Sequence, residues 1–376
     1  MHRLIEKDPR NAERIFPYLG GEEVNNSPTH SHHRYAINFE GFPLDRDIES
    51  ASWQDADDRQ RRDWLRAGSV PDDYPGAVAA DWPDLLATVM EKVRSERLMD
   101  NRENYRRLWW QFAERRPGLA SELSRASRAL VISRVSQMVA FVFVATNIVP
   151  AETTVAIVLE QLLAFCVLQS RPHEIWARFM ASSLEDRLRY APTDCFETFP
   201  FPANYEINPA AEIAGKTYYE FRADVMVRNN EGITKTYNRF HRPDEYSPDI
   251  LKLRELHDAM DRAVLDACGW HDLQPVCEFF PEFDDEDDEE SESTRPRQKR
   301  YRYRWPDDIH DEVLARLLAL NRERAGISRR ARCRSAKTSP KVDPPQEGCA
   351  SRSVQAVLTP VRRSAMLNST KKQASG

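Results

Sequence analysis

Five stretches of the chain place apolar residues at the spacing of an α-helix. The pattern has the clearest boundaries after Ser247, where Pro248 begins a helix and Gly269 follows its end. Serine before a helix, proline in its first turn and glycine just beyond it are common boundary residues. The predicted helices cover residues 82–97, 172–180, 209–229, 248–268 and 305–325.

Alternating or β-branched runs predict strands, and all of them lie in the first 203 residues. Two of these runs flank residues 135–138, and they predict a hairpin. The predicted strands are 34–39, 129–134, 139–144 and 188–190, and residues 155–169 begin like a strand.

This order of elements predicts an α+β fold. We expect a mixed α/β domain over residues 1–203, followed by a helical C-terminal domain over 204–283. Between two of the predicted helices, residues 232–243 (GITKTYNRFHRP) are polar, basic and aromatic, and they show no core period. This segment is therefore predicted to be a surface loop.

Charge is distributed unevenly along the chain, although its net value is only -6. Residues 321–376 hold 13 Lys+Arg and 3 Asp+Glu, which leaves a net charge of -16 on the first 320 residues. Eight of the nine residues in 284–292 are acidic, and residues 295–304 contain six bases. Such runs stay solvated. We therefore expect a charged disordered linker over 284–304, a C-terminal helix over 305–326 and a disordered basic tail over 327–376.

Composition excludes several classes of activity. Only 12 of the 376 residues are glycine, and no two of them are separated by a single residue, so the chain has no GxG. Nucleotide and S-adenosylmethionine loops need such glycines because their backbone passes close to the ligand. The sequence also lacks the [DNS]-P-P-[YFW] motif of adenine methyltransferases and the acidic-x-lysine element of PD-(D/E)xK nucleases. We expect no cofactor site and no catalytic residue in this chain.

The cysteines and histidines predict neither disulfides nor a metal site. Six cysteines are scattered without a CxxC pair, as in reduced cytoplasmic proteins. His30, His32 and His33 cluster without a cysteine or carboxylate at ligand spacing, which favours a solvated loop over a metal site. The mean hydropathy is -0.66. Because no apolar run approaches the ~18 residues of a membrane span, we expect a cytoplasmic location without membrane contact.

One stretch within the predicted body is strongly basic. Residues 97–134 carry nine arginines and four acids, with Tyr105, Trp109 and Trp110 among them. Arginine outnumbers lysine 44 to 10 in the chain, which codon bias in a GC-rich genome would explain. Arginine is also the side chain that forks onto phosphates and guanine edges. The stretch is therefore a candidate nucleic-acid surface, and we expect both tryptophans to lie in the core.

Several strings in succession resemble a known family. They include PYLGGEEVNNSP (17–28), NRENYRRLWWQFAERRPGL (101–119), LVISRVS (130–136), LRYAPTDCFETFPFP (188–202) and GITKTYNRFHRPDE (232–245). This order resembles the C-terminal part of MmeI-like adenine-specific DNA methyltransferases, the type IIL and IIG restriction–modification enzymes. The resemblance covers about residues 14–325, and it implies a target-recognition domain followed by a helical C-terminal domain.

The resemblance implies that the chain recognises double-stranded DNA for an N6-adenine methyltransferase of a restriction–modification or phage-defence system. In that family, the nuclease and methyltransferase modules precede this region. We therefore expect S-adenosylmethionine to bind a separate or lost upstream module, and that module to be the partner. The alternative is a truncated non-catalytic remnant or a regulatory protein-interaction module. The residues expected to contact DNA are Arg106, Arg107, Arg115, Arg116, Ser133, Arg134, Ser136, Lys235, Tyr237, Asn238 and Arg239.

Overall fold

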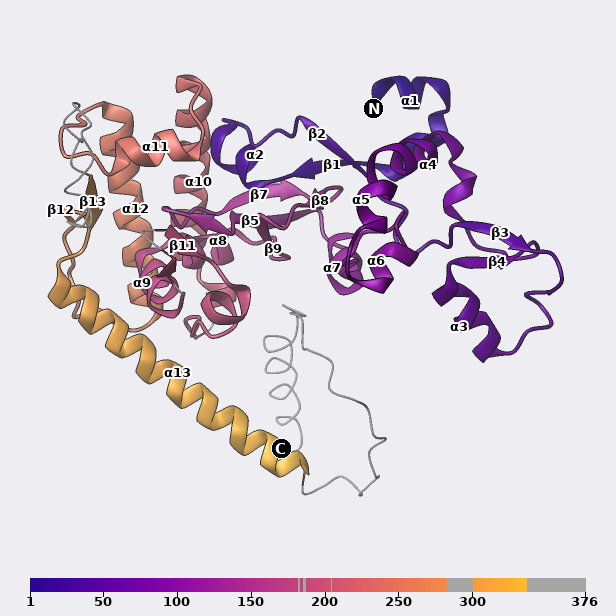
Figure 1. Cartoon of the computed structure of the whole chain (residues 1–376). Coiled ribbons are helices and arrows are strands. Elements are labelled where there is room, and N and C mark those ends of the chain that lie inside the picture. Colours follow the sequence, from indigo (N-terminus) through magenta and orange to yellow (C-terminus); the bar gives the residue numbers. More distant parts are fainter. Residues whose placement is uncertain (182, 185–186, 204, 283–299, 337–376) are drawn as a thin grey trace, which may run out of the picture. The chain divides into compact units, whose positions relative to one another are not determined.

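The computed structural model describes residues 1–181, 183–184, 187–203, 205–282 and 300–336. Helices and small sheets are mixed along this part of the chain, which confirms the predicted α+β class (Figure 1). Packing divides the chain into two units that interleave along the sequence. Unit 1 comprises residues 1–19, 32–125 and 146–151, and unit 2 comprises residues 20–31, 126–145 and 152–376.

Unit 1 is built from two small sheets and a set of short helices. β1 (Ile15–Leu19) pairs antiparallel with β2 (Arg34–Ile37) and parallel with β8 (Val149–Pro150). β3 (Asp45–Ile48) runs parallel to β4 (Ser69–Pro71). The helical elements are α1 (His2–Lys7), η1 (Pro9–Arg14), α3 (Asp58–Ala67), η2 (Ala79–Asp81), α4 (Pro83–Val89), η3 (Met90–Arg94), α5 (Ser95–Leu98), α6 (Glu103–Arg107) and α7 (Pro117–Leu123).

A helix that runs through α4, η3 and α5 contributes to the core of unit 1. It begins at Pro83, as predicted, and Leu85 and Val89 are buried. A π turn over η3 changes the side-chain register. Met90, the first residue of this turn, is 44% exposed. Trp109 and Trp110 are buried in the same cluster as Leu85, which confirms their predicted placement.

Unit 2 contains the antiparallel sheet β7-β5-β9, made of β5 (Arg128–Ser133), β7 (Val142–Ala145) and β9 (Thr154–Ile157). The pairing of β5 with β7 confirms the two strands of the predicted hairpin. Their connection is longer than a tight turn, because β6 (Val135–Ser136) pairs with β11 (Arg187–Arg189) in a second sheet. The third strand of that second sheet is β10 (Ser183–Leu184).

Helices of unit 2 pack together closely beside the sheet. α10 (Pro209–Asn229) crosses α8 (Leu162–Gln169) at Gly215, where an added Cβ would lie 2.7 Å from the carbonyl oxygen of Leu162. α12 (Pro248–Ala267) begins after Ser247, as the boundary residues predict. The other elements of this part are α2 (Gly21–Asn26), α9 (Arg171–Met180), η4 (Pro192–Phe196) and η5 (Tyr205–Ile207).

The segment predicted to be a surface loop, residues 232–243, contains the helix α11 (Ile233–Phe240). The loop prediction was wrong because a helical period is present. Ile233, Thr236, Tyr237 and Phe240 are all buried, and they stand three, four and seven residues apart. Threonine and tyrosine at two of these four positions conceal the period in the sequence.

The end of the described chain differs from the expected linker and helix. Residues 301–304 form β13 (Tyr301–Arg304), which pairs antiparallel with β12 (Glu278–Pro281). The pairing buries Arg302, whose charge is balanced by Glu282. α13 (Asp307–Ala336) continues beyond the expected end at 326. The acidic run 284–292 and the tail from residue 337 lie outside the described residues.

The boundary expected at residue 203 separates predicted functional modules, and packing continues across it inside unit 2.

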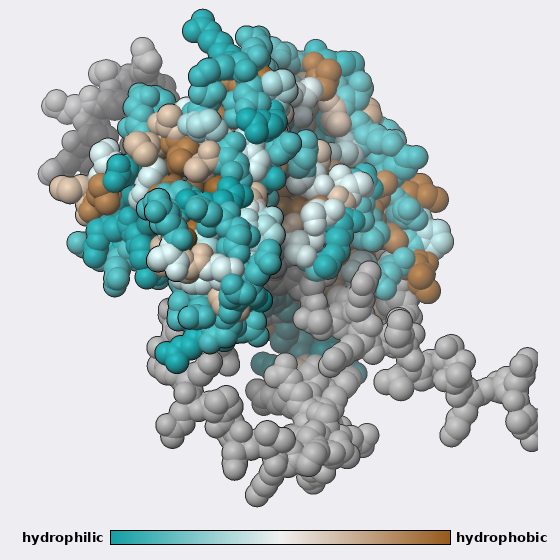
Figure 2. Space-filling view, turned by 90° about the vertical axis from the view of Figure 1, so that its right-hand side faces the viewer, coloured by the Kyte–Doolittle hydropathy of each residue, from teal (hydrophilic) through white to brown (hydrophobic). Residues whose placement is uncertain are grey.

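Figure 2 shows one face of the molecule, on which hydrophilic residues predominate and hydrophobic ones form small patches. In the part of the chain that the structure describes, no helix is both long enough and apolar enough to cross a membrane.

Candidate nucleic-acid interface

A groove with a volume of about 590 Å³ opens on unit 1. Its lining contains four arginines and no acidic residue, and we call it the arginine groove. The arginines are Arg62, Arg66, Arg107 and Arg115. The other lining residues are Gly41, Leu65, Asn104, Tyr105, Leu108, Gln111, Phe112 and Ala113.

Helix α3 supplies two of the arginines. A capping box begins it: Asp57 accepts a hydrogen bond from the backbone of Gln60 at 2.8 Å, and the Gln60 side chain accepts one from the backbone of Asp57 at 3.1 Å. Gly68 ends the helix with a φ of 90°. Arg62 and Arg66 are one turn apart and line the same groove. Arg61 and Trp64 are half-buried on the face toward Trp53, and the other side chains of α3 are exposed.

A second wall is formed by α6 and the segment that follows it. Trp110 Nε1 and Gln111 Nε2 both donate to the carbonyl oxygen of Phe42, at 3.0 and 2.7 Å. These two bonds fix the segment after α6 against the turn that contains Gly41. Arg115 lies on this turn, because a Cβ added to Gly41 would stand 2.6 Å from its Nη1 atom.

The positive charge of the groove is not neutralised by neighbouring carboxylates. Within the described chain, Arg62, Arg107 and Arg115 form no ion pair. Arg66 has only Asp63, at 3.9 Å on the exposed surface, and such pairs are weak. Arg107 Nη2 donates only to the neutral side chain of Asn104, at 3.0 Å, and guanidinium groups without a close counter-charge attract anions. Because each guanidinium can fork onto two oxygens, the groove can hold successive phosphates.

Four of the sequence-predicted DNA contacts lie in unit 1, and the structure brings two of them together in the groove. These are Arg107 and Arg115. Arg106 is half-buried, and its Nη1 donates to the carbonyl oxygen of Asp100 at 2.6 Å. Arg116 is exposed before α7, with a φ of 44° and Glu114 at 3.7 Å.

Three further candidates belong to the β5–β6 region of unit 2. Ser133 is buried on β5, and its hydroxyl lies against Gly21. Arg134 is half-buried, and its backbone N–H donates to the carbonyl oxygen of Thr153 at 2.8 Å. Ser136 Oγ accepts a hydrogen bond from the backbone of Met138 at 3.1 Å. Ser133 is therefore too deep for direct contact with a ligand outside the fold.

The last four candidates lie on α11. Lys235 and Asn238 are exposed, and Tyr237 is buried. Arg239 is bound by Glu231 at 3.1 Å and by Glu245 at 3.0 Å, and its Nη2 also donates to Ser247. Hydrogen bonds from Arg239 lower the pKa of Glu245 to about 2. Arg239 and Tyr237 thus have partners inside unit 2, where the sequence analysis expects them to contact DNA.

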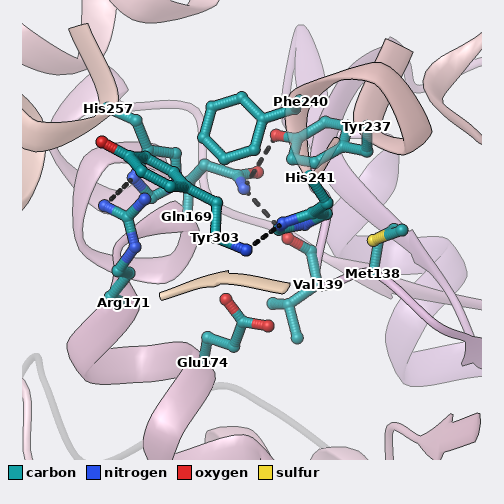
Figure 3. A pocket seen from close by; sticks show the side chains of 10 residues that line it. All are labelled: Met138, Val139, Gln169, Arg171, Glu174, Tyr237, Phe240, His241, His257 and Tyr303. Atoms are coloured by element: carbon teal, nitrogen blue, oxygen red, sulfur yellow. Dashed lines mark hydrogen bonds between the residues drawn. The ribbon is translucent and has the colours of Figure 1, made fainter. Parts of the chain in front are cut away.

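Behind α11, unit 2 encloses a polar core that has no room for a ligand (Figure 3). The space within it is about 10 Å³, which admits one water molecule at most. Gln169 donates to the carbonyl oxygen of Val139 and to the Tyr237 hydroxyl. Arg171 contacts His257 at 3.1 Å, and the backbone of Tyr303 donates to His241. Most of these polar groups are therefore hydrogen-bonded to one another, and Arg171 Nη2 is the exception, a buried nitrogen without a partner among the described residues.

Sequence reasoning missed Arg62 and Arg66. Their signal is the four-residue spacing in the string RQRRDWLRA, which places both on one side of a helix. The basic stretch found in the sequence begins at residue 97 and does not include them. Folding brings α3 beside α6, so that both line one groove.

The described residues contain no group of three His, Cys, Asp or Glu side chains that could hold a metal ion. Of the clustered histidines, His30 bonds to the carbonyl oxygen of Val24 at 2.9 Å, and His32 packs edge-on against Tyr35. Burial lowers the pKa of His30 to about 4.

The fold and site define a mixed α+β protein with a closed polar core and a basic surface groove. Residues 73–203 match the family "MmeI, target recognition domain". Residues 73–203 are therefore similar to the MmeI target recognition domain, and this match confirms the resemblance found in the sequence. The groove residues Asn104–Arg115 lie within the match, while Gly41 and α3 precede it.

A solved structure has the same fold over most of the chain. It is the type IIL restriction–modification enzyme MmeI in complex with DNA, with a TM-score of 0.51 and 18% sequence identity. The alignment covers 86% of this chain and 33% of that chain, so the present chain spans about a third of the length of the enzyme. No curated protein matches the sequence.

Proposed function

We propose that this chain binds double-stranded DNA and selects the target site for an adenine-specific DNA methyltransferase of a restriction–modification or phage-defence system. The catalytic methyltransferase, its S-adenosylmethionine and the nuclease would belong to a separate module. The proposed location is the cytoplasm, where that DNA lies. The observation that carries the proposal is the arginine groove, part of whose lining lies within residues 73–203, which match the target recognition domain.

The chemistry of the groove suits the DNA backbone. Four guanidinium groups with only one weak carboxylate neighbour can exchange counterions for phosphates without losing strong internal ion pairs. Phosphate contacts fix the position and register of the protein, and other side chains then read base edges. Asn104 and Gln111 line the same groove, but Gln111 is 5% exposed and its amide already donates to Phe42. Asn104 is exposed, and although its Oδ1 accepts a hydrogen bond from Arg107 Nη2 at 3.0 Å, it is the better candidate for a base edge.

Duplex binding across a range of salt concentrations tests the proposal. If the four groove arginines each neutralise one phosphate, the slope of log K against log salt should be about -4. Replacing all four with alanine should weaken binding by more than about 100-fold and make the slope shallower by about 3 to 4. Fluorescence anisotropy with a labelled duplex measures both quantities. Unchanged binding by the quadruple variant would overturn the proposal.

A matched control uses another exposed arginine of α3. Arg59 lies on the same helix but does not line the groove. Arg59→Ala should change affinity by less than about twofold, because an arginine outside the groove contributes only long-range charge. An equal loss from Arg59→Ala and Arg62→Ala would show that net charge, rather than the groove, binds the duplex.

The methyltransferase part of the proposal has its own test. The chain alone should give no saturable heat with S-adenosylmethionine in isothermal titration, because the sequence has no GxG loop. Micromolar binding would contradict the proposed division of labour. If the chain instead bound another protein tightly and did not prefer DNA over polyglutamate, the alternative, a regulatory protein-interaction module, would be supported.

A further inference from the structure

Gly41 stands where any side chain would displace an arginine of the groove. A Cβ built on Gly41 would lie 2.6 Å from Arg115 Nη1 and 3.8 Å from Arg115 Cζ. Real Cβ atoms do not approach other heavy atoms within 3.0 Å, so the guanidinium would have to move. Among the described residues, no other group lies within 4 Å of that position, apart from chain neighbours.

Backbone geometry does not require glycine at this position. The φ of Gly41 lies outside the left-handed region, which an L-residue adopts only with strain. The preceding residue, Glu40, takes the left-handed conformation of this turn, with a φ of 54°. The structural demand on Gly41 is therefore space for Arg115.

The surroundings hold Gly41 in a fixed place relative to the groove. The next residue, Phe42, accepts hydrogen bonds from Trp110 and Gln111, which stand a few positions before Arg115. The backbone of Phe42 also donates to the carbonyl oxygen of Phe39 at 3.0 Å, which closes the turn. Both ends of the contact, the turn and the segment carrying Arg115, are thus fixed to each other.

We propose that Gly41 is a positioning residue for DNA binding. Because Gly41 has no side chain, the Arg115 guanidinium can lie against its backbone, in the position in which it contacts a phosphate. A flat guanidinium that lies on the backbone is preorganised, and less side-chain freedom is lost when the phosphate binds. The inference rests on the proposed function, because it assigns a role within the same groove.

Gly41→Ala tests this role without damaging the fold. The atom that must shift is the far end of a flexible side chain, and the backbone conformation is open to alanine. The melting temperature should therefore stay the same or rise slightly, because alanine reduces the freedom of the unfolded chain. Affinity for a labelled duplex should fall about three- to tenfold, close to the roughly tenfold loss expected for Arg115→Ala.

Gly118→Ala is the matched control. Gly118 also lies in unit 1, and nothing stands within 4 Å of its added Cβ. This variant should leave the affinity unchanged, and its melting temperature should rise slightly, because Gly118 lies in α7, where alanine is favoured over glycine. An equal loss of affinity in Gly118→Ala and Gly41→Ala would overturn the positioning role.

A double-mutant cycle separates positioning from a general effect on the surface. When Arg115 is already alanine, the added Gly41→Ala change should weaken binding no further, because there is no guanidinium left to displace. Independent, additive losses would overturn the inference while leaving the groove intact. If Arg115→Ala itself has no effect on binding, the assignment of Arg115 in the proposed function fails as well, so the two failures are distinguishable.

Discussion

The groove arginines of unit 1 and the buried arginines of unit 2 differ in what surrounds them. In the arginine groove, Arg62, Arg107 and Arg115 are exposed, and none of them pairs with a carboxylate of the described chain. Inside unit 2, Arg171 and Arg222 are buried and bonded. Arg171 pairs with Asp261 at 2.5 Å, and Arg222 donates to the carbonyl oxygen of Phe141 at 2.6 Å.

This comparison teaches that arginine-rich sequence does not by itself mark a binding surface. A buried guanidinium needs a counter-charge or hydrogen-bond acceptors inside the fold, because desolvation costs several kcal/mol per ion. It is then unavailable to an external phosphate. An exposed guanidinium without partners loses little when it exchanges counterions for a ligand. The groove arginines of unit 1 are thus available to an external anion, whereas the buried arginines of unit 2 are held by groups of the fold.

Removal of a buried partner should give the largest effect. Asp261→Ala leaves the buried Arg171 with only the half-exposed Asp258 as a counter-charge. The free energy of unfolding should fall by about 3–5 kcal/mol, since an uncompensated charge remains inside. Urea unfolding measures the loss. Asp63→Ala, which removes the surface partner of Arg66, is the control and should cost less than about 0.5 kcal/mol. An equal loss of unfolding free energy in the two variants would contradict the difference between the buried arginine of unit 2 and the exposed arginine of unit 1.

Acid should destabilise unit 2 through His173. Burial lowers the pKa of His173 to about 4, below its ordinary value of 6.5. The folded state therefore binds the proton more weakly, and stability is complete above pH 6.5 and falls as the pH drops toward 4. The loss from this residue should reach about 3 kcal/mol. Unfolding of His173→Gln should depend less steeply on pH over this range. The same slope in both proteins would exclude His173 as the cause.

Arg239 sharpens the comparison because the sequence analysis and the structure give it different roles. Its guanidinium binds Glu231, Glu245 and Ser247. Arg239→Ala should lower the free energy of unfolding by about 1–2 kcal/mol, because the pairs are partly buried. Duplex affinity should change by less than about twofold. A strong loss of affinity without a loss of stability would restore Arg239 to the DNA contacts.

Groove arginines should show the smallest effect on stability. Arg62→Ala and Arg107→Ala should each shift the free energy of unfolding by less than about 0.5 kcal/mol, since both side chains are exposed. Each should nevertheless weaken duplex binding and reduce the salt slope by about 1. Thermal unfolding and anisotropy on the same samples check both. A large loss of stability would place these arginines in the architectural class.

Much of the fold could be predicted because the elements have strong local signals. Ser247, Pro248 and the apolar repeat of α12 define one helix, and β-branched residues define β5 and β7. α11 could not be recognised, because half of its buried face is polar. Tyr237 is accommodated on that face because its hydroxyl forms a hydrogen bond in the folded protein. β13 was also missed, since Arg302 is buried only after Glu282 from the paired strand neutralises it.

Half of the candidate groove was within reach of the sequence. The basic stretch 97–134 includes Arg107 and Arg115, but it also includes arginines that the structure places elsewhere. Nothing in the linear spacing relates this stretch to Arg62 and Arg66, or to Gly41. The contact between these segments depends on hydrogen bonds from Trp110 and Gln111 to Phe42, about 70 residues away in the chain.

The sequence by itself determined the class of fold, most helices and strands, the excess of arginine and the succession of motifs that relates the chain to target recognition domains. These properties are local, because they depend on residue spacing and on short strings. Only the tertiary structure decided which arginines are free to meet a ligand. That property depends on whether folding brings a carboxylate or a carbonyl oxygen to each guanidinium, as Asp261 reaches Arg171 and no acid of the described chain reaches Arg115.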